Sequence, residues 1–131
     1  MTSSRHRRTI APLVVAGVAI ASLSAPAAAG DGDVISRGSC SASSDWKVKA
    51  SPENGRIEVE GEIDSSRVGQ TWTWKLLQNG SVAARGQGVT AARSGSFEVR
   101  RVLPNLPGTD VVAIRARNAS TGEACRGSLS Y

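Results

Sequence analysis

Histidine, cysteine and aromatic residues are scarce in this chain of 131 residues. Its single histidine, His6, lies in a segment expected to be removed, which excludes a Ser-His-Asp or Cys-His nucleophile from the mature protein. Two cysteines without a histidine cannot build a zinc site from the usual ligands. We therefore expect no catalytic residue, no metal site and no cofactor, and we predict that the protein is not an enzyme.

Residues 1–29 have the composition of a secretory signal peptide. Three arginines lie within the first eight residues, an apolar stretch covers 10–23, and alanines at 27–29 offer small residues for cleavage. The apolar stretch is shorter than the roughly 20 residues that a membrane-spanning helix needs. We expect this leader to be cleaved and the protein to be secreted without a membrane anchor. The general and the twin-arginine export routes both remain open.

Removal of the leader lowers the net charge. The whole chain carries 16 Lys+Arg and 11 Asp+Glu, a net charge of +5. Without Arg5, Arg7 and Arg8, 13 cations face 11 anions and the net charge is +2. A strongly basic domain is typical of nucleic-acid-binding proteins. Because part of the basic character belongs to the leader, we do not expect a nucleic-acid partner.

Cys40 and Cys125 are predicted to form a disulfide. They are the only cysteines, and extracellular conditions favour their oxidation. A pair of reactive thiols would favour a Cys-x-x-Cys spacing, which is absent. The bridge would close nearly the whole domain and stabilise it by about 4–5 kcal/mol through the loop entropy of the unfolded chain.

Apolar and polar residues alternate with a period of two over 45–131, which is typical of β-strands. The preceding segment, 30–44, is rich in Gly, Ser and Asp and is expected to be a flexible arm pinned at Cys40. The stretch DWKVKASPENGRIEVEGEI predicts a hairpin with its turn at 52–55, which places apolar pairs on one face and opposite charges on the other. The predicted pairs are Ser51–Arg56, Ala50–Ile57, Val48–Val59, Trp46–Gly61, Lys49–Glu58 and Lys47–Glu60.

The stretch TWTWKLLQNG predicts a second hairpin, because Asn79-Gly80 favours a type I′ turn. Trp72 and Trp74 are either a ligand-docking surface or part of the core. If they faced solvent, the inner face of their strand would be Thr71, Thr73 and Lys75, so we predict that the tryptophans are buried. The predicted pairs are Leu77–Val82, Leu76–Ala83 and Trp74–Arg85.

The last hairpin predicts a basic surface. Its inner pairs are expected to be Ala116–Cys125, Ile114–Gly127 and Val112–Leu129, which forces Arg115 opposite Arg126 on the outer face. Arg117 lies one rung away, and Lys75 would join from the adjacent strand. A clustered basic face of this kind is typical of an anion-binding surface. Alternatively, the arginines extend into water or reach Glu98 and Glu123, and the face has no function.

A further strand is expected over 96–102, with Phe97 and Val99 facing inward. Together with the three hairpins this makes seven short strands with intervening turn signals, which are typical of an all-β, immunoglobulin-like β-sandwich. The stretch SFEVRRVLPNLPGTDVVAIRARN, with its corner at 106–109, resembles the closing half of fibronectin type III and related immunoglobulin-like modules. The whole chain is also similar to small secreted proteins of actinobacteria whose function is unknown. Neither resemblance implies a catalytic residue, because this fold hosts many activities.

Three functions remain open at this point. The first is a secreted binding module whose candidate residues Lys75, Arg115, Arg117 and Arg126 engage an acidic protein or an anionic cell-wall polymer. The second is an inhibitor or toxin-like protein that acts through a loop, with the tips at 93–95 and 119–122 as candidates. The third is a small-molecule carrier, although the few aromatic residues leave little to line a pocket. The oligomeric state is not predicted.

Overall fold

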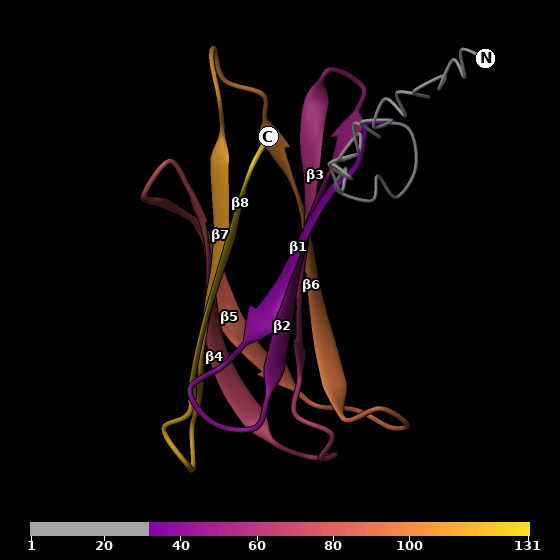
Figure 1. Ribbon diagram of the computed structural model, residues 1–131, viewed down its shortest axis with the longest axis vertical. Coiled ribbons are helices and arrows are strands. Elements are labelled where there is room, and N and C mark those ends of the chain that lie inside the picture. Colours follow the sequence, from indigo (N-terminus) through magenta and orange to yellow (C-terminus); the bar gives the residue numbers. More distant parts are fainter. Residues whose placement is uncertain (1–31) are drawn as a thin grey trace, which may run out of the picture.

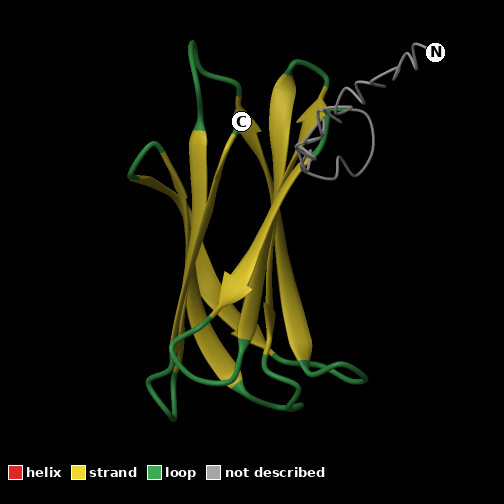
Figure 2. Cartoon of the chain, in the orientation of Figure 1, coloured by secondary structure: helices red, strands yellow, loops and turns green. Residues whose placement is uncertain are grey.

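The computed structural model describes residues 32–131, which form two antiparallel β-sheets packed face to face (Figures 1 and 2). The signal peptide expected over 1–29 lies outside the described residues. Sheet A has the strand order β1-β2-β3-β6, and sheet B has the order β5-β4-β7-β8. The strands are β1 (Val34–Ser39), β2 (Asp45–Glu53), β3 (Arg56–Asp64), β4 (Thr71–Gln78), β5 (Ser81–Val89), β6 (Ser96–Pro104), β7 (Val111–Asn118) and β8 (Ala124–Ser130).

The sandwich and the disulfide confirm two predictions, but there are eight strands rather than seven. The additional strand, β1, lies within the segment 30–44 that was expected to be a flexible arm. It pairs with β2 along its whole length, from Val34 opposite Ala50 to Ser39 opposite Asp45. Its VISRGS sequence has too little alternation to distinguish an edge strand from a loop. No helix among residues 32–131 is long and apolar enough to cross a membrane.

Trp72 and Trp74 lie in the core, as predicted. Trp72 is fully buried and Trp74 is 6% exposed, whereas Thr73 and Lys75 of the same strand face solvent. The buried side chains of both sheets meet in one cluster that also contains Ile57 of β3 and Ile114 of β7, among others. Because alternate residues of a strand point to opposite faces, the position of the tryptophans fixes which residues of sheet B are exposed.

Aromatic rings of the core lie over glycines of neighbouring strands. The Trp46 ring lies between Gly38 of β1 and Gly127 of β8, so a β-carbon at either glycine would overlap it. The prediction that Trp46 lies opposite Gly61 was wrong, since its partners on the neighbouring strands are Gly38 and Ile63. Trp46 remains half-buried at the edge where β1 and β8 meet.

The register predicted for the first hairpin was wrong by two residues. The turn consists of Asn54 and Gly55 alone, which both have positive φ angles of 48° and 77° and connect Glu53 to Arg56. This two-residue turn matches the twist of the strands better than the longer turn that was expected. A shift of two residues keeps every side chain on its face, so Lys47 now pairs with Glu62. The other pairs are Lys49–Glu60, Ser51–Glu58, Ala50–Val59, Val48–Gly61 and Pro52–Ile57.

The second hairpin contains a β-bulge that was not predicted. The Asn79-Gly80 turn and the pair Leu77–Val82 are as expected, but the register then shifts between Leu76 and Leu77. Leu76 therefore lies opposite Ala84 rather than Ala83, Lys75 lies opposite Arg85, and Trp74 lies opposite Gly86. The extra residue directs Arg85 to the outer face of sheet B, where it is exposed.

Candidate anion-binding face

Basic side chains form a row across all four strands of sheet B. Arg85 of β5 lies opposite Lys75 of β4, which lies opposite Arg115 of β7, which in turn lies opposite Arg126 of β8. All four are exposed. Because neighbouring strands lie about 4.8 Å apart, the row is roughly 14 Å long at the level of the backbone. We call these four residues the basic row.

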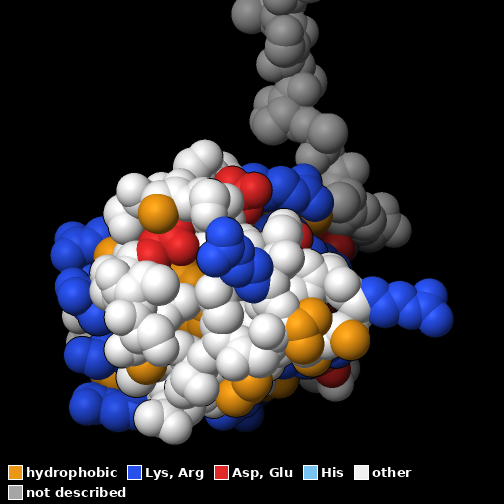
Figure 3. All heavy atoms as spheres, turned by 90° about the horizontal axis from the view of Figure 1, so that it is seen from below, with side chains coloured by type: hydrophobic (Ala, Val, Ile, Leu, Met, Phe, Trp, Pro, Cys, Tyr) orange, Lys and Arg blue, Asp and Glu red, His pale blue; other side chains and the backbone are white. Residues whose placement is uncertain are grey.

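Arg117 extends the basic row along β7. It is exposed and lies opposite Thr73 of β4 and Ala124 of β8. The candidate residues Lys75, Arg115, Arg117 and Arg126 therefore share one face of sheet B, and the pair Arg115–Arg126 has the predicted register. In the view from below, Lys and Arg side chains line the flank of the molecule on the side of sheet B (Figure 3).

Carboxylates are absent from the outer face of sheet B among the described residues. Its outward-facing positions around the basic row include Thr73, Gln87, Arg117 and Ser128, together with the half-buried Ala113 and Ala124. Within residues 32–131, no ion pair involves the basic row or Arg117. The five ion-pair contacts found there, such as Lys47–Glu62 at 3.5 Å, all lie on the outer face of sheet A.

The acidic residues that could have neutralised the basic row are engaged elsewhere. Glu98 lies 3.6 Å from Arg100 on sheet A. Glu123 accepts hydrogen bonds from the Ser44 N–H at 2.9 Å, the Ser44 hydroxyl at 2.7 Å and the Ala42 N–H at 3.0 Å. Burial alone would raise the pKa of Glu123, but these hydrogen bonds outweigh it and lower the pKa. The ionised carboxylate is therefore held in its loop and forms no ion pair with the arginines of sheet B among the described residues.

A shallow hollow of about 200 Å³ lies beside the basic row. Its lining includes Thr73, Lys75, Arg115 and Arg117, together with Trp74 and Ala116. Three of these side chains are cations and one is a hydroxyl, which are the groups that hold phosphate or carboxylate oxygens. The face can thus seat one anionic group in the hollow while neighbouring cations contact others.

Arg85 is the functional candidate that the sequence prediction missed. The expected register paired Arg85 with Trp74 and so directed an arginine into the core. An unpaired charge is costly to bury, and this conflict was the available signal that the strand contains a bulge. The bulge resolves the conflict and adds the fourth cation to the row.

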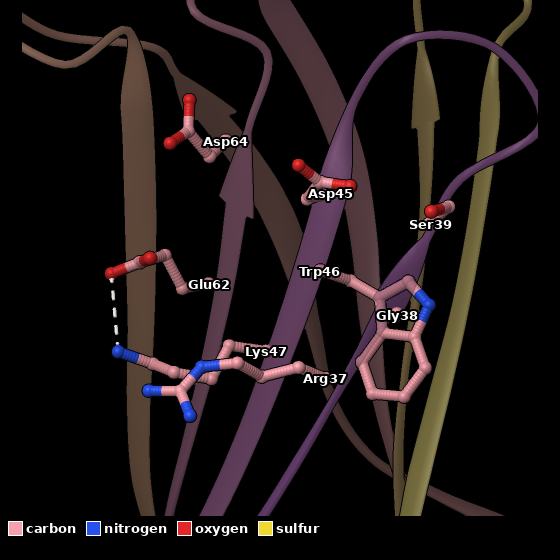
Figure 4. Close-up of a pocket in the computed structure, with 8 residues that line it drawn as sticks. All are labelled: Arg37, Gly38, Ser39, Asp45, Trp46, Lys47, Glu62 and Asp64. Atoms are coloured by element: carbon pink, nitrogen blue, oxygen red, sulfur yellow. Dashed lines mark ion pairs between the residues drawn. The ribbon is translucent and has the colours of Figure 1, made fainter.

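A larger hollow lies on the other sheet. It measures about 420 Å³ and is formed on the outer face of sheet A at the end of β1, β2 and β3 (Figure 4). Arg37 and Lys47 lie on one side of it, and the carboxylates of Asp45 and Asp64 lie on the other. Within residues 32–131, no group of three or more acidic, histidine or cysteine side chains is placed to hold a metal ion.

No family model, curated protein or solved structure matches the chain.

Proposed function

We propose that the protein is a secreted, non-catalytic binding module that holds an anionic cell-wall polymer on the basic face of sheet B. The observation that carries this proposal is the basic row, which crosses four strands without one carboxylate among the neighbouring outward-facing residues. Like charges opposite each other cost stability in a sheet. The negative groups of a bound polyanion would offset that cost, because each would lie close to several of these cations.

The composition of the face favours a polymer over an acidic protein. Binding energy at protein–protein interfaces is concentrated in buried aromatic and other large anchors. Around the basic row most outward side chains are cations, hydroxyls and an amide, with the small Ala113 among them. The exposed aliphatic residues Val82, Val89 and Val111 lie at or next to the ends of their strands. A surface that offers mainly charge suits a chain of repeated phosphate or carboxylate groups.

The orientation of the basic row predicts how such a chain would lie. The four cations are arranged across the strands rather than along one strand. A linear polymer that contacts all of them would therefore run perpendicular to the strands. An anionic group in the hollow beside Thr73 and Arg117 would anchor it.

The proposal is tested by binding to isolated cell walls and to soluble polyphosphate at two salt concentrations. We expect binding at low salt that is strongly reduced at high salt, because ions screen exposed charges. The double variant Arg115→Glu/Arg126→Glu should lose binding. The matched control Arg56→Glu/Arg93→Glu changes the net charge equally and should keep most of it.

Two outcomes would contradict the polymer assignment. Unchanged wall binding by the Arg115→Glu/Arg126→Glu variant would remove the basic face from the interaction. Salt-sensitive binding to an acidic protein, without binding to walls or polyphosphate, would assign the same face to a protein partner instead.

The inhibitor hypothesis finds less support in the loop it requires. Arg93 is exposed in the connection between β5 and β6, but the Gly95 N–H donates to the Ala91 carbonyl at 2.9 Å. This bond closes the segment into a tight turn. A protease cleft binds extended chain, so the observed turn does not present Arg93 in the form that a substrate-like inhibitor needs.

We further infer that the domain is immunoglobulin-like. The segment 105–110 connects β6 of sheet A to β7 of sheet B, so the corner that resembles fibronectin type III modules is where the chain changes sheets. A disulfide and a buried tryptophan between two antiparallel sheets are also typical of this architecture.

A further inference from the structure

Two like charges also face each other on the outer face of sheet A. Asp45 and Asp64 are directly opposite each other at the end of the β2–β3 ladder. The next two rungs on the same face pair opposite charges instead, with Lys47 opposite Glu62 and Lys49 opposite Glu60. No cation lies within ion-pair distance of Asp45 or Asp64 among the described residues. The rung therefore carries two neighbouring negative charges without a counterion from this part of the chain.

A cation without a partner lies across the same hollow. Arg37 of β1 is exposed, lies opposite Lys47, and makes no ion pair within residues 32–131. Lys47 is held by Glu62 at 3.5 Å, so among residues 32–131 the guanidinium of Arg37 is the positive group beside the hollow that has no ion-pair partner (Figure 4). The hollow of about 420 Å³ thus has a cationic side and an anionic side.

The spacing of these charges defines what could bind. Arg37 and Asp45 are diagonal neighbours, since Arg37 pairs with Lys47, two residues from Asp45. Diagonal neighbours in an antiparallel pair are about 7–8 Å apart, too far for a direct ion pair without bending of the side chains. A ligand with one charge of each sign can span this distance.

We propose that the hollow of sheet A binds a small zwitterion. Its ammonium group lies between the carboxylates of Asp45 and Asp64, and its carboxylate accepts hydrogen bonds from Arg37. The two charges must be separated by several bonds, as in 5-aminopentanoate or a dipeptide, and not by two bonds as in an α-amino acid. This site lies on the opposite sheet from the basic row and does not depend on the proposed polymer binding.

The test is a titration of the full domain with ω-amino acids of increasing length, from glycine to 6-aminohexanoate. The backbone of Trp46 borders the hollow, and its half-buried ring packs between Gly38 and Gly127 on the inner side of sheet A. Trp72 and Trp74 are buried in the core, so we expect Trp46 to give the fluorescence change when a ligand binds next to Asp45. We expect a saturable change that is strongest for the longer members. Glycine, pentanoate and pentylamine should bind about five-fold more weakly or worse, since each loses at least one exposed ion pair.

Substitutions of the charged residues around the hollow test whether the zwitterion binds there. Asp64→Asn and Arg37→Gln should each weaken 5-aminopentanoate binding by about five-fold. Glu53→Gln, on the outer face of the same strand as Asp45, is the matched control and should change nothing. Glycylglycine should bind, and acetylglycylglycine, which lacks the ammonium group, should not.

Three results would overturn the proposal. These are the absence of a saturable response to any zwitterion, equal binding of glycine and 5-aminopentanoate, and unchanged affinity in both Asp64→Asn and Arg37→Gln. Circular dichroism of each variant shows whether the fold is kept. Amide NMR shifts at Asp45 and Asp64 provide a second readout that does not depend on the tryptophan.

Discussion

Arg115 and Arg126 lie directly opposite each other on β7 and β8, and both are exposed on the outer face of sheet B. Facing like charges lower the stability of an antiparallel pair. Sheet A avoids this arrangement on two successive rungs, with Lys47 opposite Glu62 and Lys49 opposite Glu60. Sheet A also has facing like charges, such as Asp45–Asp64, but it carries ion pairs, whereas no ion pair within residues 32–131 involves the basic row. The proposed polymer would supply the counterions that the basic row lacks among these residues.

Arg126→Glu should therefore stabilise the domain while it abolishes polymer binding. The new carboxylate would face Arg115, and replacing repulsion by attraction should raise the free energy of unfolding by about 0.5–1 kcal/mol at low salt. Urea unfolding at low and high salt measures this gain, which should shrink as ions screen the pair. Ser128→Glu, on the same face of β8 opposite Ala113, is the control and should give a smaller gain. A loss of stability in Arg126→Glu at low salt would contradict the account.

Reduction of the disulfide should destabilise the domain strongly. Cys40 and Cys125 are separated by 85 residues along the chain. Closing a loop of this length restricts the unfolded chain by about 4–5 kcal/mol in the loop-entropy model. The double variant Cys40→Ser/Cys125→Ser should lose this amount in urea unfolding. A loss below about 1 kcal/mol would show that the unfolded chain is already compact without the bridge.

Gly127→Ala should disturb the packing around Trp46. A methyl group at this position would overlap the indole ring, which lies against the glycine from across the sandwich. Overpacking of this kind typically costs about 1–3 kcal/mol. Thermal unfolding measures the loss, and a shift in the Trp46 emission would localise it. The neighbouring exposed change Ser128→Ala should leave both properties nearly unchanged.

Glu123 should contribute to acid sensitivity. Its pKa in the folded protein is lowered, because hydrogen bonds from Ser44 and Ala42 outweigh the effect of burial. The stability it provides is thus present above the pKa of the unfolded chain, near 4.5, and is lost as the pH falls through the lower folded value. Glu123→Gln should cost about 1–2 kcal/mol at pH 7, where charge-assisted hydrogen bonds are lost. The stability of the variant should also decline less steeply below pH 4.5 than that of the wild type. Equal slopes of the two stability curves below this pH would contradict the role of Glu123.

The face of each predicted strand was easier to derive from the sequence than its register. The first hairpin was misaligned by two residues, yet Val48 and Val59 are fully buried because a shift of two keeps side chains on the same face. The last hairpin was aligned correctly, since its four-residue loop and the inward Cys125 leave one consistent register. Alternation of apolar and polar residues therefore sufficed to identify the core and four of the five cations on sheet B.

The alternation of apolar and polar residues did not predict features that depend on single residues. The bulge near Leu76 changes the face of Arg85 without any change in composition, so only the conflict of a buried arginine pointed to it. The strand β1 has no clear alternation and is held by pairing with β2, which the local sequence does not encode. The charge-separated hollow at Arg37 depends on β1 and was missed with it.

The bridge between Cys40 and Cys125 also determines how the domain would respond to pulling. Tension applied at the two ends of the domain would be carried by the disulfide and not by the chain between the cysteines, which are separated by 85 residues. Fully extended, that stretch would add on the order of 300 Å to the length of the chain. If the domain were attached to a wall at one end and pulled at the other, the chain between the two cysteines could not extend while the disulfide is intact. It could extend only after reduction.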